Sequence, residues 1–250
     1  MNKKENTYTE LDEKLRKMRL SSMADVLEKQ GEDPNRDLRT FDERIEEIIN
    51  AEWITRHNKK LNRFLSKADL RYPSATFDEA LEDPERQLDV EAINRLATCE
   101  WIDQRKNLLI TGKSSTGKSY AGNALAVCAV QRFMPVRYVK ASYLMNELEK
   151  AQIQNKFLEY INALSSLALL IIDDFGLMEL DPDKCRYLFE VLDARDGRGS
   201  VMIISQLPVS SWHSMFKDNT YADACMERLI RGAYRLEFNG KNMRKAKEES

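Results

Sequence analysis

The chain has 250 residues, of which 42% are hydrophobic and 32% charged, and its formal net charge is −2 at pH 7. This length suits one medium-sized α/β domain with an appendage, and the composition is that of a soluble globular protein. No apolar run approaches the roughly 20 residues of a membrane-spanning helix, and the N-terminus lacks the apolar core of a signal peptide, so we expect a cytoplasmic protein without a membrane partner. The wide spacing of the four cysteines argues against a zinc site or a disulfide framework.

Residues 1–70 predict a helical N-terminal domain. Leu11, Leu15 and Met18 follow the spacing of one helix face, and Gly31 favours the end of that helix. Residues 40–43 have the form of a capping box that starts another helix. A region of this size is too thin to bury a large core alone. Both a plain helical appendage and a dedicated interaction module therefore remain open.

Basic side chains gather near the end of this helical region. Residues 56–71 contain a single carboxylate, Asp69. The basic residues of this stretch are Arg56, Lys59, Lys60, Arg63, Lys67 and Arg71. Such a patch is typical of a polyanion site, but on helices it is as often a solvated face. On charge alone, contact with DNA and a solvated surface are equally open.

We predict a linker over residues 71–88 and an α/β domain over residues 89–250. Residues 89–103 predict a helix, and strands and helices alternate from Asn107 onward. The expected strands cover residues 107–110, 136–140, 167–172 and 200–205. Short apolar strands separated by helices are typical of a parallel central sheet covered by helices on both faces.

Residues 112–119 fit the phosphate-binding pattern G-x-x-x-x-G-K-[ST], between a predicted strand and a helix predicted over residues 120–133. Backbone N–H groups and the helix N-terminus of such a loop bind phosphates. We expect Lys118 to contact the β- and γ-phosphates and the Ser119 hydroxyl to ligate Mg²⁺. The sequence therefore predicts a site for ATP and Mg²⁺. The expected nucleotide contacts are Gly112, Lys113, Ser114, Ser115, Thr116, Gly117, Lys118, Ser119 and Tyr120.

A second stretch has the form of a Walker B element. Residues 169–172 are apolar and run directly into Asp173 and Asp174, about 55 residues after the phosphate loop. Adjacent carboxylates at the end of a buried strand are costly without a cation. Asp173 would hold Mg²⁺, through water, and Asp174 would orient the attacking water.

The strand over residues 200–205 would bring Ser205 and Gln206 to the same edge of the sheet. A polar side chain there is suited to contact the γ-phosphate or the attacking water, although strand ends often carry polar residues. No N-K-x-D guanine-reading motif and no lid with an acceptor-site signature is present, which disfavours a GTPase and a kinase without excluding them.

Taken together, these motifs resemble those of the IstB family, the AAA+ helper ATPases of bacterial insertion sequences, which are close to the DnaC helicase loaders. The motifs are residues 112–119, residues 169–176, residues 205–208 with Trp212-His213, and residues 223–229. The resemblance covers nearly the whole chain, from roughly residue 11 to 245. It implies a P-loop AAA+ fold behind a small helical N-terminal domain. We expect the helical lid common in AAA+ proteins to be missing.

The resemblance also implies roles for individual residues. Ser205 and Gln206 fall at sensor 1, where an Asn is more usual, so which of the two acts there stays open. Arg228 falls at the arginine finger, which reaches the γ-phosphate of a neighbouring subunit and completes the site there. Arg244 matches a terminal, sensor-2-like arginine that contacts the nucleotide.

The phosphate loop departs from the pattern of its relatives. It reads G-K-S-S-T-G-K-S, where these proteins usually have G-P-x-G-x-G-K-T. Ser119 keeps the hydroxyl, whereas Lys113 and Ser115 make the loop bulkier and more basic. We expect nucleotide binding to be retained, with its affinity and the hydrolysis rate open.

The function that the resemblance implies is a DNA-binding AAA+ ATPase that assists a transposase. ATP would drive the protein to assemble with copies of itself on duplex DNA and to deform it, and hydrolysis would disassemble the oligomer. A DnaC-like replicative helicase loader is the alternative, and a P-loop enzyme or switch acting on a small molecule comes third. Largely sequence-independent phosphate contacts are expected from Arg56, Lys59, Lys60, Arg63, Lys67, Arg195 and Arg198.

Overall fold

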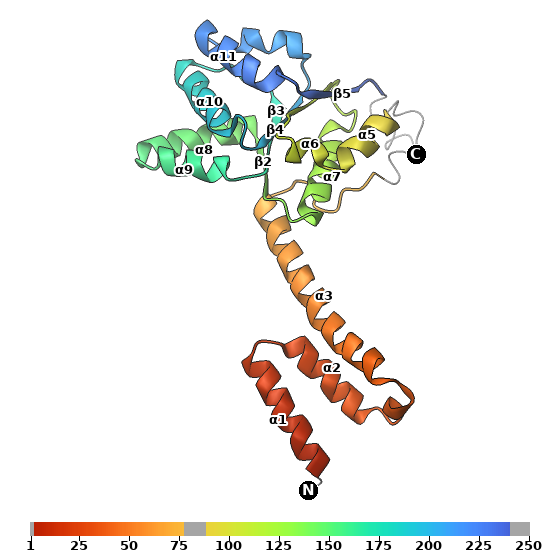
Figure 1. The fold of residues 1–250 in the computed structure, drawn as a ribbon. Coiled ribbons are helices and arrows are strands. Elements are labelled where there is room, and N and C mark those ends of the chain that lie inside the picture. The colour runs from red at the N-terminus through yellow and green to blue at the C-terminus, as the bar shows by residue number, and fades with distance from the viewer. Residues whose placement is uncertain (1–2, 78–88, 241–250) are drawn as a thin grey trace. The chain divides into compact units, whose positions relative to one another are not determined.

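The computed structural model describes residues 3–77 and 89–240, with side chains from Thr9 onward (Figure 1). The chain divides into two compact units, Met1–Arg63 and Phe64–Ser250. The predicted linker therefore lies outside the described residues from position 78 to its end, and so does Arg244.

The first unit is helical. It contains α1 (Lys3–Lys17), α2 (Ser21–Glu32), the 3-10 turn η1 (Arg36–Leu38) and most of α3 (Phe41–Ala68). The predicted capping box is confirmed: the Glu43 amide donates to Thr40 Oγ1 at 3.3 Å, and the Thr40 amide donates to the Glu43 carboxylate at 2.8 Å. Only a few side chains of this unit are buried, among them Ala24 and Ile48. Its core is correspondingly thin.

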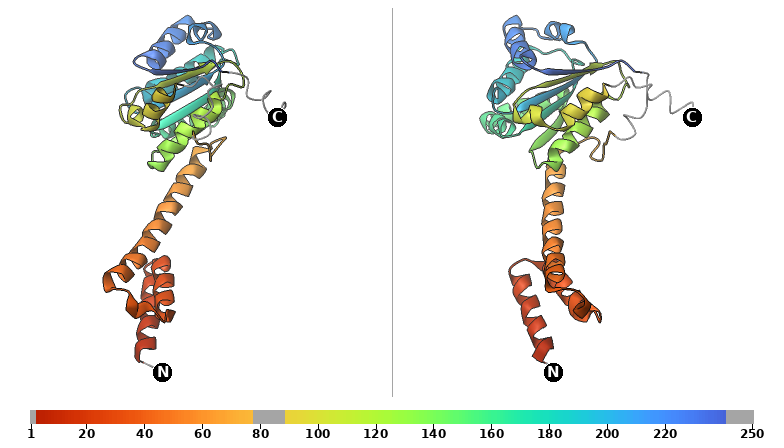
Figure 2. Two further views of the ribbon diagram at one scale, coloured as in Figure 1. Left: turned by 90° about the vertical axis from the view of Figure 1, so that its right-hand side faces the viewer. Right: turned by 45° about the vertical axis from the view of Figure 1, so that its right-hand side comes forward.

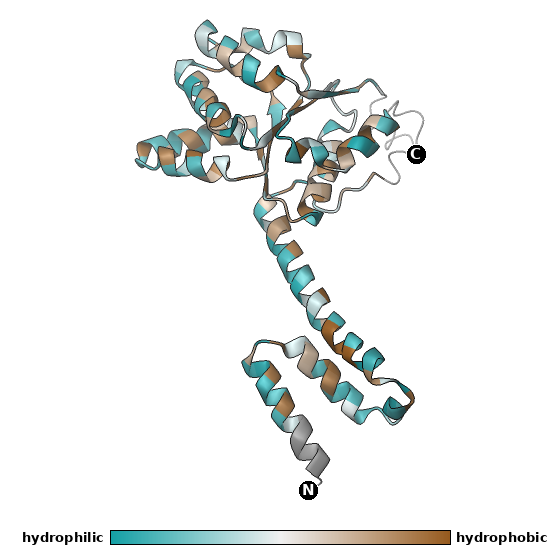
Figure 3. Cartoon of the chain, in the orientation of Figure 1, coloured by the Kyte–Doolittle hydropathy of each residue, from teal (hydrophilic) through white to brown (hydrophobic). Residues whose placement is uncertain are grey.

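Helix α3 leaves large apolar side chains exposed. Phe41, Ile49 and Trp53 are each more than half exposed, and hydrophobic and polar positions alternate along the helix in Figure 3. Most stabilisation of a surface helix comes from burying one apolar face. The first unit therefore covers only part of the apolar surface of α3.

The second unit is built on a five-stranded sheet with the order β2-β3-β4-β1-β5, in which all pairings are parallel. The strands are β1 (Leu108–Gly112), β2 (Val136–Lys140), β3 (Leu169–Phe175), β4 (Ser200–Ser205) and β5 (Tyr234–Phe238). The predicted parallel sheet is confirmed, with β5 as an additional edge strand that the sequence pattern did not indicate. The carboxyl ends of β1, β3 and β4 lie side by side at the centre of the sheet.

Helices cover both faces of this sheet (Figure 1, Figure 2). They are α5 (Val90–Ala97), α6 (Glu100–Asp103), α7 (Lys118–Gln131), α8 (Ala141–Ile153), α9 (Phe157–Ser165), α10 (Pro182–Arg195) and α11 (Asn219–Ile230). Successive residues of a strand point to opposite faces. Val201 and Ile203 of β4 join the core under α8 to α11, whereas Met202 and Ile204 face Gly122 of α7. Both faces of β4 are thus buried, which explains its continuous apolar sequence.

The prediction of one continuous helix over residues 89–103 is wrong. The structure has two helices there, because Cys99 adopts a left-handed conformation with φ +61° between them. In the described part of the chain no helix follows β5, and no described helix is long and apolar enough to span a membrane.

Candidate nucleotide site

The phosphate loop connects β1 directly to α7, and two glycines set its shape. Gly112 has φ +144°, and a Cβ there would lie 2.2 Å from the Phe238 carbonyl oxygen, so β5 approaches too closely for a side chain. Gly117 has φ +95°, and a Cβ there would meet no atom within 4 Å, which leaves an open cradle beside the start of α7. Ser115 adopts φ +64°, a conformation that costs a non-glycine residue about 1 kcal/mol.

Lys118 lies in the first turn of α7 and is only 6% exposed. Its ammonium donates to the Lys113 carbonyl, and Thr116 Oγ1 donates to the same carbonyl at 2.9 Å. Burial lowers the pKa of Lys118, while the carboxylates of Asp173 and Asp174 oppose that shift. The loop thus holds the desolvated Lys118 ammonium beside the N-terminus of α7, a position suited to binding a phosphate.

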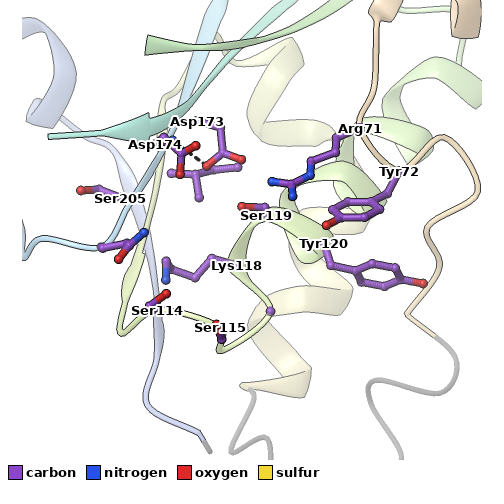
Figure 4. A pocket seen from close by; sticks show the side chains of 13 residues that line it. Arg71, Tyr72, Ser114, Ser115, Lys118, Ser119, Tyr120, Asp173, Asp174 and Ser205 are labelled. Carbon is purple, nitrogen blue, oxygen red and sulfur yellow. Dashed lines mark hydrogen bonds between the residues drawn. The ribbon is translucent and has the colours of Figure 1, made fainter. Parts of the chain in front are cut away.

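A pocket of about 190 Å³ opens at the carboxyl ends of β1, β3 and β4 (Figure 4). It brings together predicted groups from the phosphate loop, from the end of β3 and from the end of β4. Its lining residues are Arg71, Tyr72, Ser114, Ser115, Gly117, Lys118, Ser119, Tyr120, Asp173, Asp174, Ile204, Ser205 and Gln206.

The two carboxylates predicted for the metal and the water have different surroundings. Asp173 is 1% exposed, and its Oδ2 accepts a hydrogen bond of 2.6 Å from the Tyr138 hydroxyl. Asp174 lies at an irregularity in the β3–β4 pairing, with φ +56°, and forms a 2.8 Å ion pair with Lys140. Burial and Asp173 raise the pKa of Tyr138, so its hydroxyl remains a donor that fixes the Asp173 carboxylate.

The end of β4 separates the two sensor 1 candidates. Ser205 is buried; its hydroxyl donates to the Phe175 carbonyl at 2.6 Å and accepts from the Leu207 amide at 3.1 Å. Gln206 is exposed and lines the pocket. The Ser205 hydroxyl therefore holds β3 and β4 together, and Gln206 presents the side chain that is available to a ligand.

The residues present fit a magnesium–triphosphate group. Mg²⁺ is usually held by one or two carboxylates or hydroxyls together with substrate phosphates and water, rather than by a cage of protein ligands. Ser119 and the buried Asp173 line the same pocket, and the described residues contain no cluster of three or more His, Cys, Asp or Glu side chains suited to a metal. A metal here would depend on phosphate oxygens to complete its coordination.

Arg228, the expected finger, lies at the other end of the sheet. It lines a second pocket of about 280 Å³, together with Asn107, which directly precedes β1, and Val201, the second residue of β4. Its guanidinium forms a 2.5 Å ion pair with Asp193 and lies 4.7 Å above the Phe189 ring. It is absent from the lining of the phosphate pocket of its own chain.

The predicted DNA contacts divide into exposed and buried residues. Arg56, Lys59, Lys60, Arg63, Lys67 and Arg198 are exposed. Arg195 is 1% exposed, and its guanidinium donates to the carbonyls of Leu164 and Ser200. A guanidinium that is buried on carbonyl groups is not accessible to a DNA phosphate. The structure therefore corrects the prediction for Arg195 to a structural role.

Sequence reasoning missed four residues around the phosphate pocket as site residues: Arg71, Tyr72, Tyr138 and Lys140. The available signal was position: Lys140 ends β2, Tyr138 lies two residues before it, and Arg71 and Tyr72 follow the end of α3. Tyr138 and Lys140 belong to a strand that was predicted correctly, and Lys140 is directly paired with Asp173 in the β2–β3 register. Arg71 stood out only as a basic side chain.

Comparison with known proteins identifies the family. Residues 13–250 match the family of the IstB-like ATP binding proteins. An insertion sequence ATP-binding protein of Sinorhizobium fredii is 33% identical over 234 residues, which cover 94% of each chain. The DnaC helicase loader shares the fold with a TM-score of 0.55, at 13% identity over 68% of this chain and 99% of that one.

AMPPCP-bound DnaA from Aquifex aeolicus superposes with a TM-score of 0.57, at 17% identity, over 72% of this chain and 56% of that one. These likenesses confirm the P-loop AAA+ fold, and the family match confirms the resemblance drawn from the motifs. The chain belongs to the IstB-like ATP-binding proteins associated with insertion sequences.

Proposed function

We propose that this protein is a Mg²⁺-dependent ATPase that assembles with copies of itself on duplex DNA and assists the transposase of an insertion sequence. The observation that carries the proposal is the division of the catalytic groups between the two ends of the sheet. Lys118, Ser119 and the two carboxylates line one pocket, and Arg228 lines another. A finger placed there suits a neighbour's ATP better than its own.

The residues of the phosphate pocket account for most of the chemistry. Lys118 binds the β- and γ-phosphates, while Ser119 and Asp173 hold the metal. Mg²⁺ held by these two residues would supply positive charge beside the phosphate oxygens. Asp174, kept in place by its ion pair with Lys140, orients the attacking water, and Gln206 contacts the water or the terminal phosphate.

Arg228 supplies the remaining positive charge to the adjacent subunit. A finger of this kind stabilises the transition state, and its removal typically lowers hydrolysis by a factor of about 10³ or more. The half-buried guanidinium must exchange Asp193 for the terminal phosphate of the neighbour's nucleotide. Hydrolysis would then depend on assembly.

Exposed basic side chains of α3 are the proposed DNA contacts, with Arg198 after α10. Arg56 already has partners within its own chain: it pairs with Glu52 at 2.7 Å and donates to the Arg19 carbonyl at 3.2 Å. Contacts of this type neutralise phosphates without reading bases, so binding should weaken steeply with salt. The transposase as partner is supported by the family's association with insertion sequences.

Complementation between two inactive variants tests the shared site. Asp174→Asn removes the residue that orients the water, and Arg228→Ala removes the finger. Each variant alone should hydrolyse ATP poorly, while their mixture should recover activity, because the intact Arg228 of one subunit completes the intact pocket of the other. Arg231→Ala is the matched control, since Arg231 is exposed near the same helix end and pairs with Asp196.

The wild-type rate per subunit should rise with protein concentration, and duplex DNA should shift that rise to lower concentrations. A rate per subunit that is independent of concentration and of DNA would contradict the proposal and indicate a P-loop enzyme acting on a small molecule. Capture of a replicative helicase in place of the transposase would reassign the protein as a helicase loader.

A further inference from the structure

The segment that follows α3 is fastened to the helix of the phosphate loop. The Tyr72 amide donates to Asn123 Oδ1 at 3.1 Å, and Asn123 Nδ2 donates to the Ser119 carbonyl at 2.7 Å. Asn123 is fully buried. Four residues further on, the Thr76 amide donates to the Tyr120 hydroxyl at 3.3 Å. One buried amide thus links the expected metal ligand Ser119 to the backbone just beyond α3.

Arg71 extends from this segment into the phosphate pocket. Its guanidinium lies 5.2 Å from the centre of the Tyr72 ring and points toward the side of the pocket that holds Ser119 and Asp173 (Figure 4). Burial alone would lower its pKa, but the oxygens of Tyr72, Tyr138 and Asp173 raise it above the ordinary value. An arginine guanidinium stays protonated in proteins, so this group is a cation close to the Asp173 carboxylate.

Electrostatics determines what can bind beside that cation. Asp173 would already serve Mg²⁺, and two cations next to one carboxylate repel each other unless further negative charge lies between them. Phosphate oxygens supply that charge. The planar guanidinium is also suited to bind two oxygens of one phosphate at the same time. A triphosphate carries one more charged group than a diphosphate, so its terminal phosphate could serve both the metal and the guanidinium.

We propose that Arg71 binds the terminal phosphate of ATP and thereby couples nucleotide state to the segment 69–76 that follows α3. The inference rests on the proposed ATP site. It adds to that site one phosphate-binding residue, Arg71, which lies outside the phosphate-loop and Walker B motifs. ATP anchors the segment through the guanidinium as well as through Asn123 and Tyr120, whereas ADP leaves the last two contacts only. Because α3 ends at Ala68, the anchored residue lies three positions beyond the helix.

Nucleotide affinities separate this role from a structural one. We would titrate wild type, Arg71→Ala and Arg71→Lys with ADP and with AMPPCP, a non-hydrolysable ATP analogue, in the presence of Mg²⁺. Arg71→Ala should weaken AMPPCP binding roughly tenfold, the scale of one charge-assisted hydrogen-bonded pair, and leave ADP binding within about twofold. The AMPPCP affinity of Arg71→Lys should lie between those of wild type and Arg71→Ala, because lysine keeps the positive charge but lacks the planar guanidinium that binds two oxygens.

Arg186→Ala is the matched control. The Arg186 guanidinium also lies 5.2 Å from the ring of the tyrosine that follows it, but on α10 and outside the phosphate pocket. The Arg186→Ala variant should bind ADP and AMPPCP with the affinities of wild type. Hydrogen exchange gives a second readout: the amides of residues 70–76 should exchange more slowly with AMPPCP than with ADP in wild type, and equally in Arg71→Ala.

An unchanged ratio of the two affinities in Arg71→Ala would overturn the proposal. If both affinities fell by the same factor, Arg71 would be a purely structural residue, and if neither changed, it would not contact the nucleotide. A wild-type protein that binds neither nucleotide would reject the proposed ATP site and, with it, this role. If wild type binds both nucleotides and Arg71→Ala binds them equally well, the proposed ATP site stands and only the role of Arg71 is rejected.

Discussion

The two ends of the parallel sheet both carry basic side chains, but these side chains have different partners. At the carboxyl ends of the strands, Lys118 and Arg71 face a pocket and lie near carboxylates suited to a metal. At the amino ends, Arg228 pairs with Asp193 on the surface of α10, and Arg195 is buried on two carbonyls. The same residue types thus face a candidate ligand pocket at one end of the sheet and pair with protein groups of their own chain at the other.

Helix polarity explains this difference. The helices that follow the strands begin at the carboxyl ends of the strands, so that unpaired N–H groups and the positive end of the dipole point at a ligand there. The same helices finish at the amino ends of the strands, where unpaired carbonyls attract cations. Arg195 and Arg228 lie in the last turns of α10 and α11, as this rule favours. A basic residue at the amino ends is therefore stabilised without any ligand.

The largest effect expected at the amino ends is on stability. Arg195→Met should lower the free energy of unfolding by about 2–4 kcal/mol, because two buried carbonyls lose their donors. Arg198→Ala, three residues away and exposed, should change it by less than about 0.5 kcal/mol. Denaturant unfolding measures both. Equal stabilities of the two variants would remove the distinction drawn between the buried and the exposed arginine.

The sequence was most informative where a structure depends on neighbouring residues. The bounds of β2 and β4 and the position of the phosphate loop follow from short apolar runs and one contiguous motif. Strand β5 was missed because it lies at the edge of the sheet and alternates polar with apolar side chains, Arg235 and Glu237 being exposed. The break at Cys99 depends on a single backbone conformation that no residue type there demands.

The candidate site shows the same limit. Residues 112–119 and Asp173-Asp174 were predicted because each group is contiguous in the sequence. The entry of Arg71 into the pocket depends on Asn123, 52 positions later, and the burial of Arg195 depends on Leu164. Such contacts between distant segments carry no local sequence signal, so a basic side chain cannot be assigned to DNA, to phosphate or to the core before the fold is known.

At the carboxyl ends of the strands, substitutions at Gln206 and Ser205 should separate catalysis from stability. Gln206→Ala should lower the turnover of ATP roughly tenfold, through the loss of one polar contact to the water or phosphate, with unfolding unaffected. Ser205→Ala should cost about 1 kcal/mol of stability, because the Phe175 carbonyl loses its donor, with turnover close to wild type. Steady-state kinetics and denaturant unfolding on both variants check this assignment. The reverse pattern would make Ser205 the sensor 1 residue.

The smallest expected effect concerns the acid that holds the finger. In the proposed oligomer, Asp193 would compete with a neighbour's phosphate for the Arg228 guanidinium. Asp193→Asn should therefore lower the protein concentration at half-maximal ATPase rate a few-fold, by roughly 0.5–1 kcal/mol, the usual strength of a partly exposed ion pair. Asp196→Asn, which releases Arg231 instead, is the control and should leave that concentration unchanged. If Asp193→Asn raised it, Asp193 would be orienting the finger for its neighbour. In that case the Arg228–Asp193 pair at the amino ends would also serve a nucleotide site, that of the neighbouring subunit. Of the two arginines compared there, only the buried Arg195 would then have a purely structural role.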